Sequence, residues 1–290
     1  MKKTLLNILS MAMIAIAPAI TDAQISTPQA SSAGSVGSTV GLTEVSIKYS
    51  RPKLKGRQIF GEGSDFLQPY GQMWRSGANS GSILTLSTDA EIAGNKVAAG
   101  DYLIFTIPGK DEWRFMLYSD LSIGGSVNKY DKSNEVLSTT VKPTILAQAT
   151  ETLTFNITDI SEDNTTANIE LTWADVSIKV PMKVDYDKIV MAQIEKNTKV
   201  NVGNYSAAAN YYFNTGKDLE QALKWMNMYL AEGNNNEQFW NIHTKAKILA
   251  KMGNKKEAKA VAEESLAKAK AAANGDFGYI KRNEDLIKSL

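Results

Sequence analysis

The chain has no cysteine and a single histidine among its 290 residues. The absence of cysteine excludes disulfide bonds, thiolate chemistry, cysteine-ligated zinc and a lipid-modified cysteine. One histidine cannot build a histidine-ligated metal cluster, and a Ser-His-Asp relay would have to be assembled around His243. Because His243 falls in a predicted helix of the carboxyl-terminal region, we expect a structural or solvated role for it rather than a catalytic one.

Motifs that hold common cofactors are also missing. No GxxxxGK[ST] phosphate-binding loop occurs, and Gly61-Glu62-Gly63 lacks the strand-to-helix setting of a dinucleotide site. With 32 Lys+Arg against 31 Asp+Glu, the net charge of +1 gives no indication of a nucleic-acid or anionic-membrane partner. We therefore predict no metal, no cofactor, no recognisable catalytic residue set and no nucleic-acid partner.

Residues 1–23 predict a cleaved export signal. A pair of lysines precedes an apolar run from Leu5 to Ile16, and small residues close the segment at Ala23. The run has about a dozen residues, fewer than the roughly 20 that span a bilayer, so an uncleaved anchor is the less favoured alternative. We expect a periplasmic or secreted protein that begins at Gln24 and has no integral membrane segment, with residues 24–40 as a flexible linker.

Residues 41–184 predict an all-β domain. Short runs with alternating apolar and polar residues follow one another without helical segments, which favours an antiparallel sandwich or jelly-roll-like fold over a parallel α/β fold. Within one such run, Gly94-Asn95 is a hairpin-turn signal. The run from Val176 to Val184 alternates most regularly, and its Pro181 predicts a strand that lies at an edge or pairs on one side there.

Residues 185–290 change to a helical period, so the fold class is α+β in two parts. Two segments align, and small residues recur in them at matching places: Ala209, Gly216 and Ala222, then Ala246, Gly253 and Ala258. Small residues let antiparallel helices approach closely, and each glycine suits the turn between them. The region resembles tetratricopeptide repeats, whose period is about 34 residues. It lacks their Trp-x-x-Leu-Gly opening and their closing proline.

An irregular stretch from Tyr49 to Asn79 interrupts the strand pattern. Arginines alternate with aromatic residues in it, and glycines and prolines supply turn conformations. Long irregular segments in compact domains are usually functional loops or disordered linkers, and the aromatic content argues against disorder. The candidate ligand-binding residues are Tyr49, Arg51, Arg57, Tyr70, Trp74, Arg75 and Asn79.

Two interpretations of this stretch are open. In the first, the arginines present planar donor forks to a carboxylate, sulfate or phosphate, and the aromatic rings offer faces to a sugar or another ring. In the second, the same groups satisfy loop carbonyls and stack on one another as a brace. We favour the brace for Arg57, and both interpretations remain for Arg51, Trp74, Arg75 and Asn79.

A series of motifs resembles the domain of unknown function 2911 family over roughly Ser38 to Val184. They are Gly41-Leu42-Thr43, Tyr49-Ser50-Arg51-Pro52, Gly56-Arg57-Gln58-Ile59-Phe60-Gly61, Pro69-Tyr70-Gly71, Trp74-Arg75-Ser76-Gly77-Ala78-Asn79, Ala99-Gly100-Asp101-Tyr102 and Phe105-Thr106-Ile107-Pro108-Gly109. The resemblance implies an exported protein, often with a short helical repeat region after the β domain. It implies no established activity, cofactor or substrate.

We therefore predict a non-enzymatic module of the cell envelope. Its β domain would present the irregular stretch to a small polar or anionic ligand, a carbohydrate or a partner chain, and its helical repeats would bind a protein partner. The alternative is a hydrolase that acts on a carbohydrate or cell-envelope substrate through loop carboxylates, for which Glu62, Asp65, Asp131 and Glu135 are candidates. A third hypothesis is a purely structural protein.

Overall fold

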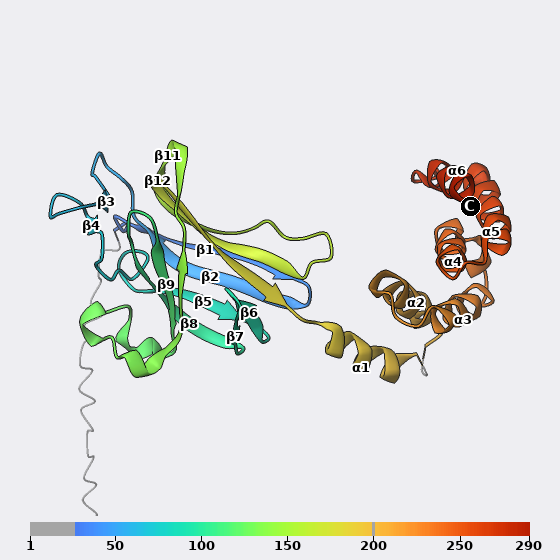
Figure 1. Cartoon of the computed structure of the whole chain (residues 1–290), viewed down its shortest axis with the longest axis horizontal. Helices are drawn as coiled ribbons and strands as arrows, with labels where there is room; N and C mark the ends of the chain where they lie inside the picture. The colour runs from blue at the N-terminus through green and yellow to red at the C-terminus, as the bar shows by residue number, and fades with distance from the viewer. Residues whose placement is uncertain (1–26, 199–200) are drawn as a thin grey trace, which may run out of the picture. The chain divides into compact units, whose positions relative to one another are not determined.

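The computed structural model describes residues 27–198 and 201–290, and the chain divides into two compact units between Lys183 and Val184. The first unit is a β domain, and the second is made of helices, so the predicted α+β class in two parts is confirmed (Figure 1). The predicted export signal, residues 1–23, lies outside the described residues. None of the described helices has the length and apolar character needed to cross a bilayer.

The β domain contains two open antiparallel sheets. Six strands form the first sheet in the order β1 (Ser32–Val40), β2 (Thr43–Arg51), β5 (Ser82–Leu86), β8 (Gly100–Ile107), β9 (Trp113–Tyr118) and β10 (Glu135–Val141). Four strands form the second in the order β11 (Thr144–Thr158), β12 (Thr166–Val184), β6 (Ala90–Ile92) and β7 (Asn95–Val97). The short strands β3 (Phe60–Gly61) and β4 (Gln68–Pro69) pair in parallel.

Alternating side chains build the core of this domain. Along β2, Val45, Ile47 and Tyr49 are buried while the residues between them face outward, as the period of two requires. The Tyr49 ring packs edge-on against Phe155 of β11, with 5.1 Å between centroids, so the two sheets share this core. A second aromatic group joins the irregular stretch to the sheets, because Phe60 lies 4.7 Å from Trp113 and 5.9 Å from Trp173 between ring centroids.

The flexible linker predicted for residues 24–40 is wrong from Ser32 onward. Residues Ser32–Val40 form β1, which pairs along its whole length with β2. The small residues that suggested a linker allow the strand to lie close to its neighbour: a Cβ on Gly34 would come within 2.7 Å of the Arg51 side chain. The β1 strand owes its order to pairing with β2 rather than to its own propensity.

Two local predictions within the sheets have different outcomes. The hairpin of β6 and β7 exists, but Ile92 pairs with Asn95, so its turn residues are Ala93 and Gly94, both with positive φ. The prediction for Pro181 is confirmed. The β11 register ends at Ser177, and the Pro181 carbonyl accepts a hydrogen bond from Ala93 N at 2.8 Å, so the strand pairs on one side there.

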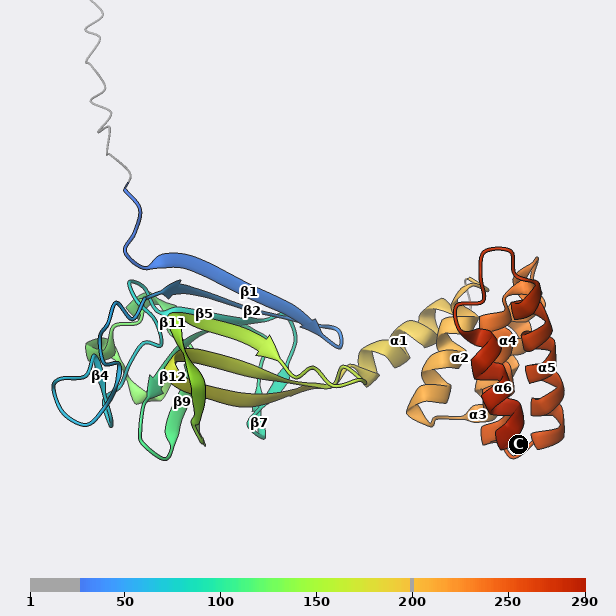
Figure 2. The same cartoon turned by 90° about the horizontal axis from the view of Figure 1, so that it is seen from above.

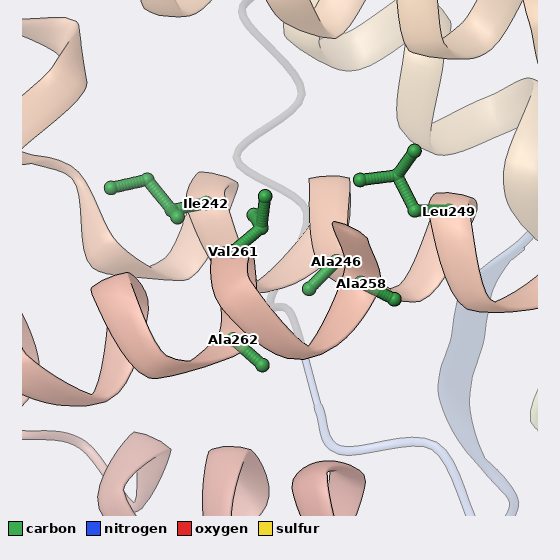
Figure 3. Packing of buried hydrophobic residues seen from close by; sticks show 6 residues of the cluster. All are labelled: Ile242, Ala246, Leu249, Ala258, Val261 and Ala262. Atoms are coloured by element: carbon green, nitrogen blue, oxygen red, sulfur yellow. The ribbon is translucent and has the colours of Figure 1, made fainter. Parts of the chain in front are cut away.

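The helical unit contains six α-helices within its described residues. They are α1 (Asp187–Asn197), α2 (Asn204–Thr215), α3 (Leu219–Leu230), α4 (Phe239–Lys251), α5 (Lys255–Ala271) and α6 (Tyr279–Ser289). Gly216 and Gly253 follow α2 and α4 with φ of 69° and 87°, which is the left-handed conformation that ends a helix. Between α4 and α5, Ala246, Ala258 and Ala262 are fully buried beside Ile242 and Leu249 (Figure 3).

A buried polar network connects α4, α5 and α6. His243 Nδ1 donates to Asn283 Oδ1 at 2.7 Å, because the Asn283 amide nitrogen already donates to Ser265 Oγ and to the Tyr279 carbonyl. Ser265 Oγ in turn donates to the Phe239 carbonyl at 2.7 Å. Each of these polar groups has a partner, so the network ties three helices together at little desolvation cost. The structural role predicted for His243 matches this position.

Burial lowers the pKa of His243 from its usual value of 6.5, and the nearby charges of Lys247 and Arg282 add to the effect. Because the unfolded chain binds the proton more readily, stability conferred by neutral His243 is complete above about pH 6.5 and declines as the pH falls below it. We expect the free energy of unfolding of the helical unit to decline by at most about 1.4 kcal/mol per pH unit, since one proton is involved.

Urea unfolding followed by helical circular dichroism between pH 7.5 and 5.5 measures this effect, above the range in which carboxylates titrate. The variant His243→Asn keeps an amide donor for Asn283 and cannot titrate. Its free energy of unfolding should stay level over the same interval, and an unchanged pH slope in this variant would contradict the assignment.

Candidate functional site

A hollow of about 420 Å³ opens beside the irregular stretch of the β domain. Figures 1 and 2 place the stretch, with β3 and β4, at the end of the domain away from the turn between β1 and β2. Residues from three separate segments line the hollow: Gln68, Met73, Trp74, Arg75, Gly77, Ala78, Asn79 and Val127. Of the seven predicted candidates, the structure brings Trp74, Arg75 and Asn79 together here.

Two backbone hydrogen bonds attach this segment to the first sheet. Trp74 N donates to the Thr106 carbonyl at 2.7 Å, and Thr106 N donates to the Trp74 carbonyl at 2.8 Å, which makes an isolated antiparallel bridge to β8. The Trp74 side chain is 4% exposed, and its Nε1 donates to the Gly77 carbonyl at 3.1 Å. Trp74 therefore acts mainly as an anchor, and it fixes the backbone on which Arg75 is carried.

The loop after Arg75 holds two non-glycine residues in the left-handed region. Ser76 has φ of 55° and Asn79 has φ of 57°. Such a conformation costs on the order of 1–3 kcal/mol and persists where surrounding contacts fix it. Ser76 is fully buried, shares a hydrogen bond with Thr106 Oγ1 at 3.1 Å and accepts one from Ser82 Oγ at 2.8 Å. These contacts hold the loop in one shape before any ligand arrives.

Glycines bring a distant segment to the hollow. The backbones of Gly81 and Gly125 touch, because a Cβ on Gly125 would lie 2.6 Å from Gly81 Cα and 3.3 Å from Arg75 Cβ. Gly81 N donates to the Gly124 carbonyl at 2.9 Å. This close approach is open only to glycine, and it places Val127, in a 3₁₀ turn, on the wall of the hollow.

Arg75 supplies the charge of the hollow. Its Nη1 donates to the Asn79 carbonyl at 2.7 Å, and this is the only hydrogen bond of the guanidinium to the described residues. Nε and Nη2 therefore keep donors for a ligand. The Asn79 amide nitrogen is within hydrogen-bonding distance of the Ser31 carbonyl and of Ser50 Oγ, which anchors the loop to the residue before β1 and to β2. The lining includes no carboxylate, so the guanidinium has no competing anion there.

Two other candidates serve the packing of the domain. Arg51 reaches across to β11, where Nε donates to the Leu153 carbonyl at 3.3 Å and Nη2 to Thr154 Oγ1 at 3.1 Å. Tyr49 is buried in the shared core. For these side chains the brace accounts for the contacts, and neither lines the hollow.

Arg57 and Tyr70 also lie outside the hollow. Arg57 donates to the carbonyls of Leu54 and Lys53 at 3.0 Å and 2.6 Å, which closes its own exposed turn as the brace interpretation predicts. Burial raises the pKa of Tyr70, and the carboxylates of Asp175, Glu62 and Asp111 raise it further. An acidic neighbourhood of this kind is unsuited to an anionic ligand.

The four carboxylates considered for a hydrolase lie outside the hollow beside Arg75. Glu62 and Asp65 are exposed and do not line the hollow. Asp131 accepts hydrogen bonds from Ser133, which lower the pKa of its carboxyl. Glu135 accepts a hydrogen bond from Tyr130 at 2.6 Å, and burial together with this bond raises the pKa of the Tyr130 phenol. Within residues 27–198 and 201–290, no three potential ligands gather as a metal site would need.

Comparison with known proteins adds one match. The family model described as "Protein of unknown function (DUF2911)" matches residues 31–182, which is just over half of the chain and covers both sheets of the β domain. No curated protein and no solved structure matches. The match begins at residue 31, directly before β1, so the family domain includes the part of the predicted linker that forms this strand.

The variant Arg51→Ala tests the division between brace and hollow. We expect it to destabilise the β domain by about 1–3 kcal/mol, because two hydrogen bonds between β2 and β11 are lost. Urea unfolding followed by tryptophan fluorescence measures this loss, and Arg57→Ala is the control with the same charge change at an exposed turn. Equal stability of the two variants would contradict the bracing role of Arg51.

Proposed function

This chain belongs to the DUF2911 family, and we propose that its β domain is a non-enzymatic binding module that holds a small anionic ligand in the hollow beside Arg75. The surroundings of the Arg75 guanidinium are the main support for this proposal. Arg75 is half-buried on a loop that hydrogen bonds hold to the sheet, its guanidinium has donors without a partner among the described residues, and the hollow's lining contains no acid. A carboxylate or phosphate meets such a planar fork through two parallel hydrogen bonds.

The size and walls of the hollow support a small organic anion. A volume of about 420 Å³ falls within the range usual for small-molecule sites. Met73 and Val127 provide an apolar wall, and Gln68 adds a polar group at the rim. A ligand with one carboxylate or phosphate group and a short carbon skeleton would use both surfaces.

The strained loop supports the same proposal. Left-handed non-glycine residues cluster at ligand sites, where fixed geometry lowers the entropy cost of binding. Here Ser76 and Asn79 both follow Arg75 in the loop, and hydrogen bonds to Thr106 of β8, to the Ser82 side chain and to the Ser31 carbonyl hold them. A loop that only covered the sheet would not need an arginine with free N–H donors beside the hollow.

For the rest of the chain we propose export and partner binding. We propose that the protein acts in the periplasm or outside the cell, and that the hairpins α2–α3 and α4–α5 are tetratricopeptide-like repeats that contact a partner protein. The left-handed glycines after α2 and α4 and the buried alanines Ala209 and Ala246 support the repeat assignment.

Amino-terminal sequencing of the protein recovered from the cell envelope or medium tests the export proposal. We expect the mature chain to begin at Gln24, because the small residues up to Ala23 fit a signal-peptidase site. Recovery of the intact amino terminus on a soluble cytoplasmic protein would contradict export.

The ligand proposal is tested by thermal shift with acetate, succinate, citrate, inorganic phosphate and sulfate. We expect at least one of these anions to raise the melting temperature. Arg75→Ala should weaken its binding by about tenfold or more, which corresponds to about 1.4 kcal/mol. Arg75→Lys should retain part of the affinity, because a lysine keeps the charge and loses the fork.

Arg57→Ala is the matched control, since it removes the same charge from the same stretch outside the hollow. Its anion binding should equal that of the unaltered protein. An equal loss in both arginine variants would indicate unspecific electrostatics, and unfolding of the unliganded Arg75→Ala protein would show that Arg75 is a brace.

A further inference from the structure

The helical unit carries three cations that lie over aromatic rings. Lys247 and Lys251 of α4 place their ammonium groups 4.9 Å and 5.1 Å from the ring centroid of Phe213 in α2. The guanidinium of Arg282 in α6 lies 4.7 Å from the ring centroid of Tyr279. Among the described residues, none of the three forms an ion pair. We call Lys247, Lys251 and Arg282 the cationic row.

Four other cations among the described residues of the unit have carboxylate partners. Lys217 pairs with Asp187 at 2.9 Å, and Lys268 pairs with Glu237 at 2.8 Å. On α6 itself, Lys281 pairs with Asp285 at 2.6 Å. None of the ion pairs among the described residues of the unit includes a member of the cationic row. The sequences of α2 and α4 contain no Asp or Glu at all.

Helical spacing puts the two lysines of the row on one face of α4. In α4, Trp240, Thr244, Lys247 and Lys251 follow one another at intervals of four, three and four residues, so they share one face. The opposite face carries Ala246 and Leu249, which pack against α5 (Figure 3). His243 connects the row to α6, because its ring packs edge-on against Tyr279 at 5.4 Å between centroids.

Ring and cation contacts thus link this face of α4 to α2 and to α6, and the face offers both charge and apolar area. Lys247 and Lys251 are exposed, and Trp240 at the start of the face is 40% exposed. A cation over a ring keeps N–H donors directed away from the ring, and it gains less there than from a carboxylate. The row is held in place without being neutralised.

We propose that this surface binds an acidic segment of a partner polypeptide, with carboxylates at the cationic row and an apolar side chain on Trp240. The inference specifies the partner of the helical unit and rests on the interaction role proposed for it, while it is independent of the hollow beside Arg75. Three cations spread over two helices match a short segment with two or three carboxylates. Nucleic acids and anionic membranes are usually bound through basic surfaces larger than three cations.

The test uses the whole chain and a hexaglutamate peptide labelled with tetramethylrhodamine, with hexaglutamine as the neutral control peptide. Fluorescence anisotropy at low salt should show saturable binding of the acidic peptide alone. The double variant Lys247→Gln/Lys251→Gln should weaken it by about tenfold or more, and Arg282→Gln should weaken it independently. The matched control, Lys255→Gln/Lys256→Gln, removes the same charge from the exposed start of α5 and should bind within about twofold of the unaltered chain.

Two further arms separate the possible outcomes. Arg75→Ala should bind the peptide normally, so a failure of the anion site in the β domain leaves this result unaffected. Binding to phosphatidylglycerol vesicles or to a single-stranded oligonucleotide should not be weakened by substitutions in the cationic row. No binding of hexaglutamate, an equal loss in the two lysine double variants, or vesicle or oligonucleotide binding that these substitutions weaken would each overturn the proposal. Should one row variant prove unfolded by circular dichroism, the other decides the outcome.

Discussion

The two hydrogen bonds between Trp74 and Thr106 determine what the β domain presents to solvent. They attach an irregular segment, which has no ladder of its own, to β8 near the middle of the six-stranded sheet. The bridge ends at Trp74, and the chain leaves the sheet after it. The left-handed turn at Ser76 then leads to Asn79, which lies within hydrogen-bonding distance of Ser31, directly before β1, and of Ser50 in β2. Arg75 directly follows Trp74, so the bridge fixes its backbone, and its side chain adds one hydrogen bond to the Asn79 carbonyl.

The two units use their polar side chains in different ways. In the helical unit, the network of His243, Asn283 and Ser265 is closed, because every donor in it has an acceptor within the unit. In the β domain, the Arg51 guanidinium forms two hydrogen bonds to β11, whereas the Arg75 guanidinium forms one hydrogen bond, to a carbonyl of its own loop. The difference between a satisfied and an unsatisfied guanidinium separates a brace from a binding group in the same stretch of sequence.

Local signals in the sequence predicted much of this fold. Gly216 and Gly253 marked the helix turns, and Pro181 marked one-sided pairing, because each depends on backbone rules that act within a few residues. The β1 strand was missed because its small polar residues have low propensity and its order comes from β2. Arg75 and Asn79 were predicted together with Trp74 since they are neighbours in the chain.

The rest of the site depends on partners far away in the chain. Arg51 and Arg75 look alike in the sequence, and their roles differ because β11 lies beside the end of β2. Val127 reaches the hollow only through the contact of Gly81 with Gly125, and neither glycine was recognised as part of the site. The adjacent pair Gly124-Gly125 was the available signal for such a close backbone approach.

The central claim is that Arg75, and not the other arginines of the stretch, receives an anion. The most direct measurement is a nuclear magnetic resonance titration of the ¹⁵N-labelled protein with succinate and inorganic phosphate, followed through the arginine Nε–H signals. We expect a saturable shift of the Arg75 signal and of the amide signals of residues 74–79, with the signals of Arg51 and Arg57 unmoved. Shifts of all three arginines without saturation, or a shift of Arg57 with Arg75 unmoved, would contradict it.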